Sequence, residues 1–214
     1  MAGQTANGEE PVIRTFFNEK AAVWDAACSE TDVAKLERTL ERLDIEPGST
    51  VLDVGTGTGV FLPFLLSRTG NGGRLVALDI AEAMLKQAQS KGFDGKVDYL
   101  HADVSSLPLL GEVFDVVVCY SSFPHFQDKL RALKEMHRVM KDGGRLFICH
   151  TSSRHAINEV HRQLPPVQND ILPDEDEMRI LLTMAGFTDV FVEDDSDSYF
   201  ASARKQRLSP FSRQ

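Results

Sequence analysis

The sequence predicts a single doubly wound α/β domain, and three observations lead to that prediction. Short apolar stretches typical of strands alternate with segments whose apolar residues recur at helical spacing. The strand-like stretches are apolar on both faces, as parallel strands must be when helices cover both sides of a sheet. The chain has 214 residues, of which 42% are hydrophobic and 26% charged, and this is the size and composition of one globular domain.

The N-terminal part is predicted to be helical. Residues 1–10 are small and polar, so we expect them to be disordered, and the domain to span residues 11–205. Apolar residues between Pro11 and Leu43 recur at helical spacing, which predicts two helices within an N-terminal cap of residues 11–46. Pro47 and Gly48 end this cap.

The middle of the chain alternates between strands and helices. The pattern predicts helices over about 60–67, 81–92 and 128–144, and strands over 49–55, 74–80, 97–103, 114–120 and 145–150. Strands separated by helical crossovers form a parallel sheet with helices on each side. The carboxyl ends of these strands therefore meet at one edge of the sheet.

The C-terminal part differs from the alternating region. Asp174 and Glu177 have the spacing of a capping box, which predicts a helix that ends at Gly186. Strands over 186–194 and 198–205 follow with a short polar link, which permits only an antiparallel hairpin. The basic tail, residues 206–214, is predicted to be a frayed end, with a weak docking tail as the alternative.

Composition excludes several classes of function. Thirty-two acidic and 23 basic residues give a formal charge of −9, which disfavours binding to nucleic acid. No stretch approaches the roughly 20 apolar residues of a membrane span, and the N-terminus lacks the pattern of a secretory signal. Three cysteines cannot all pair with one another, so we expect a reduced, cytoplasmic compartment.

A glycine-rich turn follows the first predicted strand, with the sequence DVGTGTGV over residues 53–60. Glycines let the main chain turn sharply into a helix and approach a ligand without a Cβ in the way, which favours a nucleotide-like ligand. The spacing is G-x-G-x-G, with Val60 where the dinucleotide fingerprint needs a small residue, so NAD is disfavoured. A plain tight connection between strand and helix is the alternative.

Two acidic residues end neighbouring strands at the same edge. Asp79 lies 24 positions beyond Gly55, where a carboxylate can accept hydrogen bonds from both hydroxyls of a ribose. Asp103 ends the third strand and can accept from an exocyclic adenine amine. The alternatives are that Asp79 only caps the helix that begins at Ala81 and that Asp103 only forms a turn.

With these motifs, the sequence resembles the class I S-adenosylmethionine-dependent methyltransferases, in the branch that includes the ubiquinone and menaquinone biosynthesis C-methyltransferases. The resemblance covers about residues 14 to 204, and VLDVGTGTG, ALDIAEAML, HADVSSLP, FDVVVCYSSFPHF and LKEMHRVMKDGGRLF carry it in the right order and spacing. It implies a seven-stranded sheet of order 3-2-1-4-5-7-6 whose last strand is antiparallel. The chain departs from the family at Ala81, where Ser is frequent, and at Asp142, where Pro is usual.

The resemblance also implies the residues that hold S-adenosylmethionine. The glycine turn would pass under the methionine part, Asp53 would anchor its amino-acid end, and Asp79 would bind the ribose. Asp103 and the main chain of Val104 would bind adenine. The full predicted set is Asp53, Gly55, Thr56, Gly57, Gly59, Asp79, Ile80, Asp103, Val104 and Tyr120.

The leading helix of the family covers the cofactor, so Phe17 and Trp24 are predicted to close the pocket, with Trp24 also facing the substrate; ordinary helix packing is the alternative. In this family, the loop over residues 121–126 faces the transferred methyl group. His125 is therefore the first candidate for acid/base catalysis or contact with the acceptor. The alternative is a histidine that only supports the loop by hydrogen bonds.

The segment after the fifth strand, residues 150–173, is predicted to form the acceptor pocket. It contains His150, a second catalytic candidate, together with His155 and His161 as substrate contacts. His150 ends a strand at the edge where open α/β sheets bind ligands. No metal is assigned here. One alternative is a metal ion held by His125, His150 and His161, and the other is that the segment only has a structural capping role.

The predicted function is transfer of a methyl group from S-adenosylmethionine to a small-molecule acceptor. A carbon or hydroxyl acceptor must lose a proton, whereas a thiolate or tertiary amine need not. The alternatives are a module that binds adenosylmethionine without catalysis and an NAD-dependent oxidoreductase. The sequence does not identify the acceptor, since function does not follow from fold alone.

Overall fold

The computed structural model describes residues 12–27, 32–93 and 95–207. The predicted disordered segment, residues 1–10, and most of the predicted tail lie outside these residues. None of the described helices has the length and apolar character that a bilayer crossing needs.

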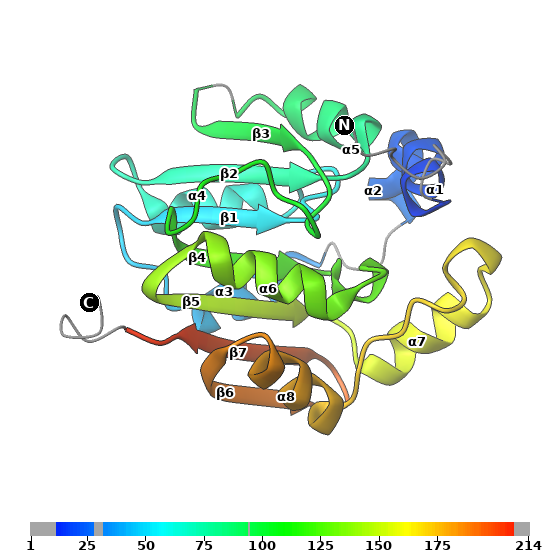
Figure 1. Ribbon diagram of the computed structural model, residues 1–214. Helices are drawn as coiled ribbons and strands as arrows, with labels where there is room; N and C mark the ends of the chain where they lie inside the picture. Colours follow the sequence, from blue (N-terminus) through cyan, green and yellow to red (C-terminus); the bar gives the residue numbers. More distant parts are fainter. Residues whose placement is uncertain (1–11, 28–31, 94, 208–214) are drawn as a thin grey trace, which may run out of the picture.

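A seven-stranded sheet of order β3-β2-β1-β4-β5-β7-β6 forms the centre of the molecule (Figure 1). Strands β1 to β5 pair in parallel, whereas β7 runs antiparallel to both β5 and β6. The predicted fold class, strand order and C-terminal hairpin are therefore confirmed. The strands are β1 (Thr50–Val54), β2 (Arg74–Asp79), β3 (Val97–His101), β4 (Phe114–Tyr120), β5 (Met140–His150), β6 (Phe187–Asp194) and β7 (Tyr199–Lys205).

Helices cover both faces of this sheet, and alternate residues of each strand enter different cores. Val117 and Cys119 of β4 pack in one core with Leu133 of helix α6, whereas Val116 and Val118 pack in the other. That second core holds the apolar faces of α3, α4 and α5. The helices are α1 (Val12–Lys20), α2 (Trp24–Ala27), α3 (Val33–Arg42), α4 (Leu62–Thr69), α5 (Glu82–Ser90), α6 (Lys129–Val139), α7 (Arg154–Arg162) and α8 (Glu175–Met184).

Three boundaries differ from the prediction. The first predicted helix is broken by a 3-10 turn over Ala21–Val23, which separates α1 from α2. Helix α4 begins at Leu62 rather than near Val60, because the left-handed turn at Gly59 (φ 78°) delays it. Helix α6 ends at Val139, and β5 begins at Met140 because this residue pairs with Phe114 of β4.

The C-terminal elements follow the sequence signals closely. Asp174 accepts a hydrogen bond from the backbone of Glu177, and the Glu177 side chain accepts one from the backbone of Asp174, which completes the predicted capping box of α8. The helix stops before Gly186, which adopts φ 97° and leads directly into β6. A local capping signal was sufficient to place this helix because both of its partners lie within one turn.

Candidate functional site

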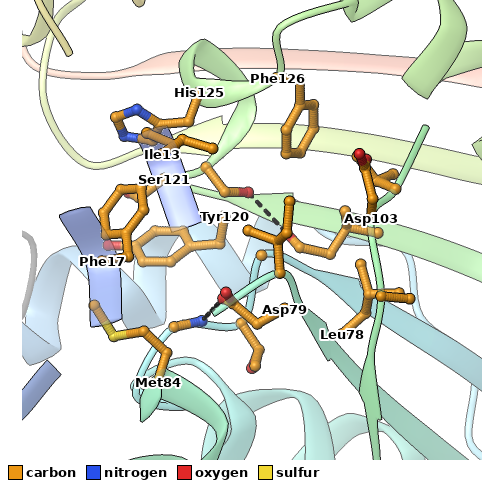
Figure 2. A pocket seen from close by; sticks show the side chains of 18 of the residues that line it. Ile13, Phe17, Leu78, Asp79, Met84, Asp103, Tyr120, Ser121, His125 and Phe126 are labelled. Atoms are coloured by element: carbon orange, nitrogen blue, oxygen red, sulfur yellow. Dashed lines mark hydrogen bonds between the residues drawn. The ribbon is translucent and has the colours of Figure 1, made fainter. Parts of the chain in front are cut away.

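A cavity of about 250 Å³ opens at the carboxyl ends of β1, β2 and β4, the edge predicted to bind a ligand (Figure 2). Three short segments after these strands supply most of its wall, and α1 and α2 cover it from the N-terminal side. Predicted residues that line it are Gly55, Thr56, Gly57, Asp79, Ile80, Asp103, Val104, Tyr120, His125, Phe17 and Trp24.

The glycine turn between β1 and α4 needs its glycines for two different reasons. Gly55 has φ 70°, and a Cβ there would lie 2.4 Å from the Cβ of Ser122. Ser122 is fixed in turn, since its hydroxyl donates to the Val54 carbonyl at 2.7 Å. Gly57 has φ 54°, and a Cβ at this residue would have none of the described atoms within 4 Å, so the missing side chain leaves open space at the cavity wall.

Asp79 ends β2 and is 7% exposed. One carboxylate oxygen accepts a hydrogen bond from the Gly57 amide and the other accepts one from the Ala81 amide, both at 2.8 Å. The oxygen that bonds the Ala81 amide thus has the capping role that was the alternative for Asp79. Because an ionised carboxylate has about four acceptor positions, these hydrogen bonds leave room for a ligand hydroxyl. Burial raises the pKa of Asp79 to about 6.

Asp103 lies on the opposite side of the cavity from Phe17 and His125 in the view of Figure 2. Its side chain accepts a hydrogen bond from the Ser105 amide at 2.7 Å, and its carbonyl accepts one from the Ser106 amide. The turn-forming role given as the alternative is therefore present. The side chain is also exposed at the cavity wall, so its second oxygen can meet a ligand.

Two predicted cofactor residues do not line the cavity. Asp53 is 1% exposed, and burial raises its pKa to about 7. It lies behind the glycine turn, from which it can act on a ligand only indirectly. Gly59 lies between two helices, since a Cβ there would be 2.8 Å from Leu62 of α4 and 3.0 Å from Ala88 of α5, so this glycine serves the packing of helices.

Helix α1 is fastened over the cavity at the start of α5. Arg14 donates two hydrogen bonds of 3.0 Å to Glu82, and Asn18 donates a third. The Asn18 side chain also accepts from the Ala83 amide at 2.9 Å. These contacts, with the Arg14 hydrogen bonds first among them, lower the pKa of Glu82 to about 2.

Aromatic side chains form the inner surface of this cover. The ring of Phe17 meets those of Trp24 and His125 edge to face, at centroid distances of 5.2 and 4.9 Å. Asp25 of α2 holds the cover at its other end, because it accepts a hydrogen bond from Thr58 and pairs with Lys91 at 2.7 Å. The predicted position of Phe17 and Trp24 at the pocket is thus found in the structure.

His125 lies in a 3-10 turn after β4 and lines the cavity. Its Nδ1 lies 2.8 Å from a carboxylate oxygen of Asp170. Burial lowers the pKa of His125, and the hydrogen bond to Asp170 opposes that change. The imidazole is therefore neutral at physiological pH and can accept a proton.

The segment over residues 150–173, which the sequence predicts to form the acceptor pocket, does not line this cavity. None of its residues, all of which the structure describes, is among those that line the cavity, and α7 projects away from the sheet edge (Figure 1). His155 is exposed on α7. The segment contacts the cavity wall from behind, because Asp170 bonds His125 and Gln127, and the Thr151 hydroxyl bonds that of Tyr120.

The other two histidines of this segment also lie outside the cavity. His150 is 2% exposed and packs against Tyr199, and burial lowers its pKa to about 3. His161 lies behind His125, with ring centroids 4.8 Å apart. No group of three or more His, Cys, Asp or Glu among residues 12–27, 32–93 and 95–207 is placed to hold a metal ion.

Several residues of the site escaped the sequence reasoning. Their side chains complete the apolar wall or bond to a predicted residue, and no motif marks them individually. Ser121 lies in the loop that the family resemblance places at the methyl group, and its buried hydroxyl has no hydrogen-bond partner among the described residues. The unpredicted wall residues include Ile13, Val60, Met84 and Gln127, whereas Ser121 and Phe126 belong to the loop that the family resemblance places at the methyl group.

Comparison with known proteins agrees with this geometry. Residues 52–148 match the family model described as a methyltransferase domain. The chain is 32% identical over 178 residues to the ubiquinone/menaquinone biosynthesis C-methyltransferase UbiE of Teredinibacter turnerae and 30% identical over 176 residues to that of Enterobacter sp.. Each match covers 80% of this chain, but only 65% and 64% of the respective relative.

A solved structure described as a SAM-dependent methyltransferase from Aquifex aeolicus is also similar. It superposes with a TM-score of 0.69 at 26% identity, over 87% of this chain and 97% of that one. The matched domain, the strand order and the glycine turn with its two acidic residues all indicate the same family. The chain therefore carries a methyltransferase domain of the class I S-adenosylmethionine-dependent methyltransferases, similar to the UbiE branch, and its cofactor is S-adenosylmethionine.

Proposed function

We propose that this protein transfers a methyl group from S-adenosylmethionine to a small, uncharged organic acceptor bound beside His125. The observation that carries the proposal is one continuous cavity. It joins the glycine turn, Asp79 and Asp103 at one end to His125 and Phe17 at the other.

The residues present fit the cofactor. Asp79 keeps acceptor capacity for a ribose hydroxyl, Asp103 keeps one oxygen for an amine, and the Ser121 hydroxyl has no partner among the described residues. The open space beside Gly57 permits close approach of a ligand to the main chain. When bound, S-adenosylmethionine supplies an electrophilic methyl group, so the protein need only position the acceptor, exclude water and accept any released proton.

The acceptor end favours a small and uncharged compound. Its wall is mainly apolar, with Ile13, Phe17 and Phe126 beside His125. Among the described residues, no Lys or Arg lines the cavity, which disfavours phosphorylated and carboxylated acceptors. The formal charge of −9 disfavours nucleic acid as the acceptor and so supports the same proposal.

Within this class we favour a quinone-related acceptor methylated at carbon. The named activity of the UbiE relatives supports it, and a flat hydroquinone ring suits a wall of aromatic side chains. The chain spans less than two thirds of those relatives, so their activity is proposed here and not transferred.

The test has two parts. Calorimetric titration with S-adenosylmethionine, S-adenosylhomocysteine and NADH should give binding of the first two only, and Asp79→Ala should weaken it. Incubation with labelled S-adenosylmethionine and naphthohydroquinone should then give a labelled product whose new methyl group is on a ring carbon. If S-adenosylmethionine binds but no labelled product forms from naphthohydroquinone or in cell extract, the non-catalytic alternative is favoured.

A further inference from the structure

We propose that Asp170 orients His125 as a proton acceptor, so that this site selects methyl acceptors whose attacking atom must lose a proton. The inference rests on the proposed function and specifies its substrate class: hydroxyl groups and activated ring carbons rather than thiolates or tertiary amines. Asp170 is a positioning residue here, because it touches His125 and not the cavity.

The hydrogen bond between the two side chains fixes the tautomer of His125. An ionised carboxylate can only accept, so Nδ1 of His125 must donate its proton to Asp170 across the 2.8 Å contact. The other ring nitrogen, Nε2, then carries the free lone pair. The side chains are only 13% and 9% exposed, so the contact is shielded from water, while the imidazole still lines the cavity.

Asp170 is held in place by other residues of its own segment, residues 150–173, which the sequence predicts to form the acceptor pocket. Its backbone amide donates to Val167, and its carbonyl accepts from Nδ1 of His161 at 2.5 Å. Asn158 of α7 fastens the end of the segment, because its side chain bonds both the amide and the carbonyl of Leu172, at 2.8 and 3.1 Å. Asn158 is itself 2% exposed, so this connection is part of the folded core.

The second carboxylate oxygen of Asp170 is also occupied. It accepts a hydrogen bond of 3.3 Å from Gln127, which follows His125 by two residues and lines the cavity. The carboxylate therefore faces the loop after β4 with both oxygens. A residue whose role was confined to its own segment would not need two contacts with this loop.

The charges around His125 support a neutral base. Burial lowers its pKa, Asp170 raises it, and His161 and Lys129 lower it further. His150 is also close enough to interact electrostatically with His125. The net effect is a pKa below the ordinary value of 6.5, so His125 is in its proton-accepting form at neutral pH.

In the proposed step, His125 takes the proton that the acceptor atom loses. The bond between the acceptor atom and its hydrogen breaks, and the proton goes to the lone pair on Nε2 of His125. The electron pair left on the acceptor atom forms the new bond to the methyl carbon, while the pair of the breaking carbon–sulfur bond stays on sulfur, giving S-adenosylhomocysteine. The resulting imidazolium is paired with the Asp170 carboxylate and later releases its proton to solvent.

The first test needs no acceptor. Nitrogen NMR of histidine-labelled protein bound to S-adenosylhomocysteine reports the tautomer and pKa of each ring, and His125→Gln assigns the signal of His125. We expect the Nδ1-protonated tautomer in the wild type. In Asp170→Asn we expect His125 to be a mixture of the Nδ1- and Nε2-protonated tautomers. Its pKa should be lower than in the wild type, because the negative charge of Asp170, which raises the pKa of His125, is gone. The same tautomer and pKa in both proteins would overturn the proposal.

The second test uses naphthohydroquinone as the acceptor. Asp170→Asn should lower kcat by about 10²–10⁴-fold, the usual contribution of a general base, with an unchanged KM for S-adenosylmethionine. The double variant with His125→Gln should be no slower than His125→Gln alone, because both changes remove one function. Asp98→Asn is the matched control, since Asp98 of β3 forms an exposed ion pair with Arg74.

The outcomes separate this inference from the proposed function. If S-adenosylmethionine binds but naphthohydroquinone is not methylated, the quinone-related acceptor is wrong, and the NMR result still decides the role of Asp170. If Asp170→Asn methylates naphthohydroquinone at the wild-type rate, the proposed function stands and this inference fails. Should Asp170→Asn not fold, the tautomer of His125 in the wild type decides alone: a proton on Nε2 excludes the proposal.

Discussion

The two ends of the cavity are built in different ways. At the β1–β3 end, the cavity wall comes from the strand ends themselves, through the turn at Gly57 and the side chains of Asp79 and Asp103. At the β4 end, His125 depends on a partner 45 residues away in the chain. The first end needs only the sheet to form, whereas the second also needs the segment after β5 to fold against it. Cofactor binding should therefore tolerate changes in that segment that acid–base catalysis does not.

The largest effect is expected at the cofactor end, from Gly57→Val. A β-branched residue at φ 54° costs about 1–2 kcal/mol in backbone strain, and its side chain fills the cavity wall. Calorimetry should show S-adenosylmethionine binding weakened by more than about 100-fold, through the loss of several hydrogen bonds worth about 1 kcal/mol each.

The matched control for this change is Gly92→Val. Gly92 follows α5 with φ 81°, and a Cβ there would enter open space, so the substitution imposes similar strain away from the cavity. It should lower the melting temperature and leave binding intact. Equal loss of binding in both variants would show that strain, and not the cavity, explains the result.

A smaller effect is expected from Asp79→Ala, which tests the carboxylate at the same end. The variant loses charge-assisted contacts with the ligand, worth about 1.5–3 kcal/mol, and also the hydrogen bond that holds the Gly57 amide. The dissociation constant for S-adenosylmethionine should rise by roughly 10- to 150-fold. A folded variant with the wild-type constant would remove Asp79 from the site.

The pH dependence sharpens the contrast, because the cofactor end holds two carboxylates with raised pKa values, about 6 for Asp79 and about 7 for Asp53. Both are near 3.8 in the unfolded chain, so the folded protein binds more protons between about pH 4 and 7. The free energy of unfolding without ligand should therefore fall as pH rises through this window. Chemical denaturation at several pH values measures it, and Asp53→Asn should flatten the curve.

Ligand binding should change in the opposite sense over part of this range. S-adenosylmethionine carries positive charge, which favours ionised Asp79, so its affinity should rise from about pH 5.5 to 7.5. Calorimetry of wild type and Asp79→Asn at both pH values gives the comparison. An affinity that is independent of pH in the wild type would mean that Asp79 does not titrate at the site.

The smallest effect is expected from Glu82→Gln, which weakens the attachment of α1 over both ends of the cavity. Its contacts with Arg14 and Asn18 are partly exposed, so the KM for S-adenosylmethionine should rise by only roughly two- to fivefold. Hydrogen exchange of α1 should accelerate in parallel. Glu37→Gln on the exposed face of α3 is the control and should alter neither quantity.

Motifs predicted residues that line the β1–β3 end of the cavity, because each of them lies in or just after a strand end. Asp79 and Asp103 reach the same edge simply because parallel strands share a direction. The sequence placed Gly59 with the other turn glycines, but in the structure it packs against Ala88 of α5. Glycine spacing indicates a turn and does not indicate which glycine faces the ligand and which faces a neighbouring helix.

By itself the sequence determined the alternation of strands and helices, the sheet order through its family resemblance, and the glycine turn with its two carboxylates. Only the tertiary structure decided that residues 150–173 do not line the cavity and that Asp170 meets His125. Hydrophobic periodicity and capping patterns act over a few residues, so they specify elements. The meeting of Asp170 with His125 depends on how α7 and the chain after it pack as a whole, through Asn158 and Leu172, and no spacing in the sequence encodes that distance.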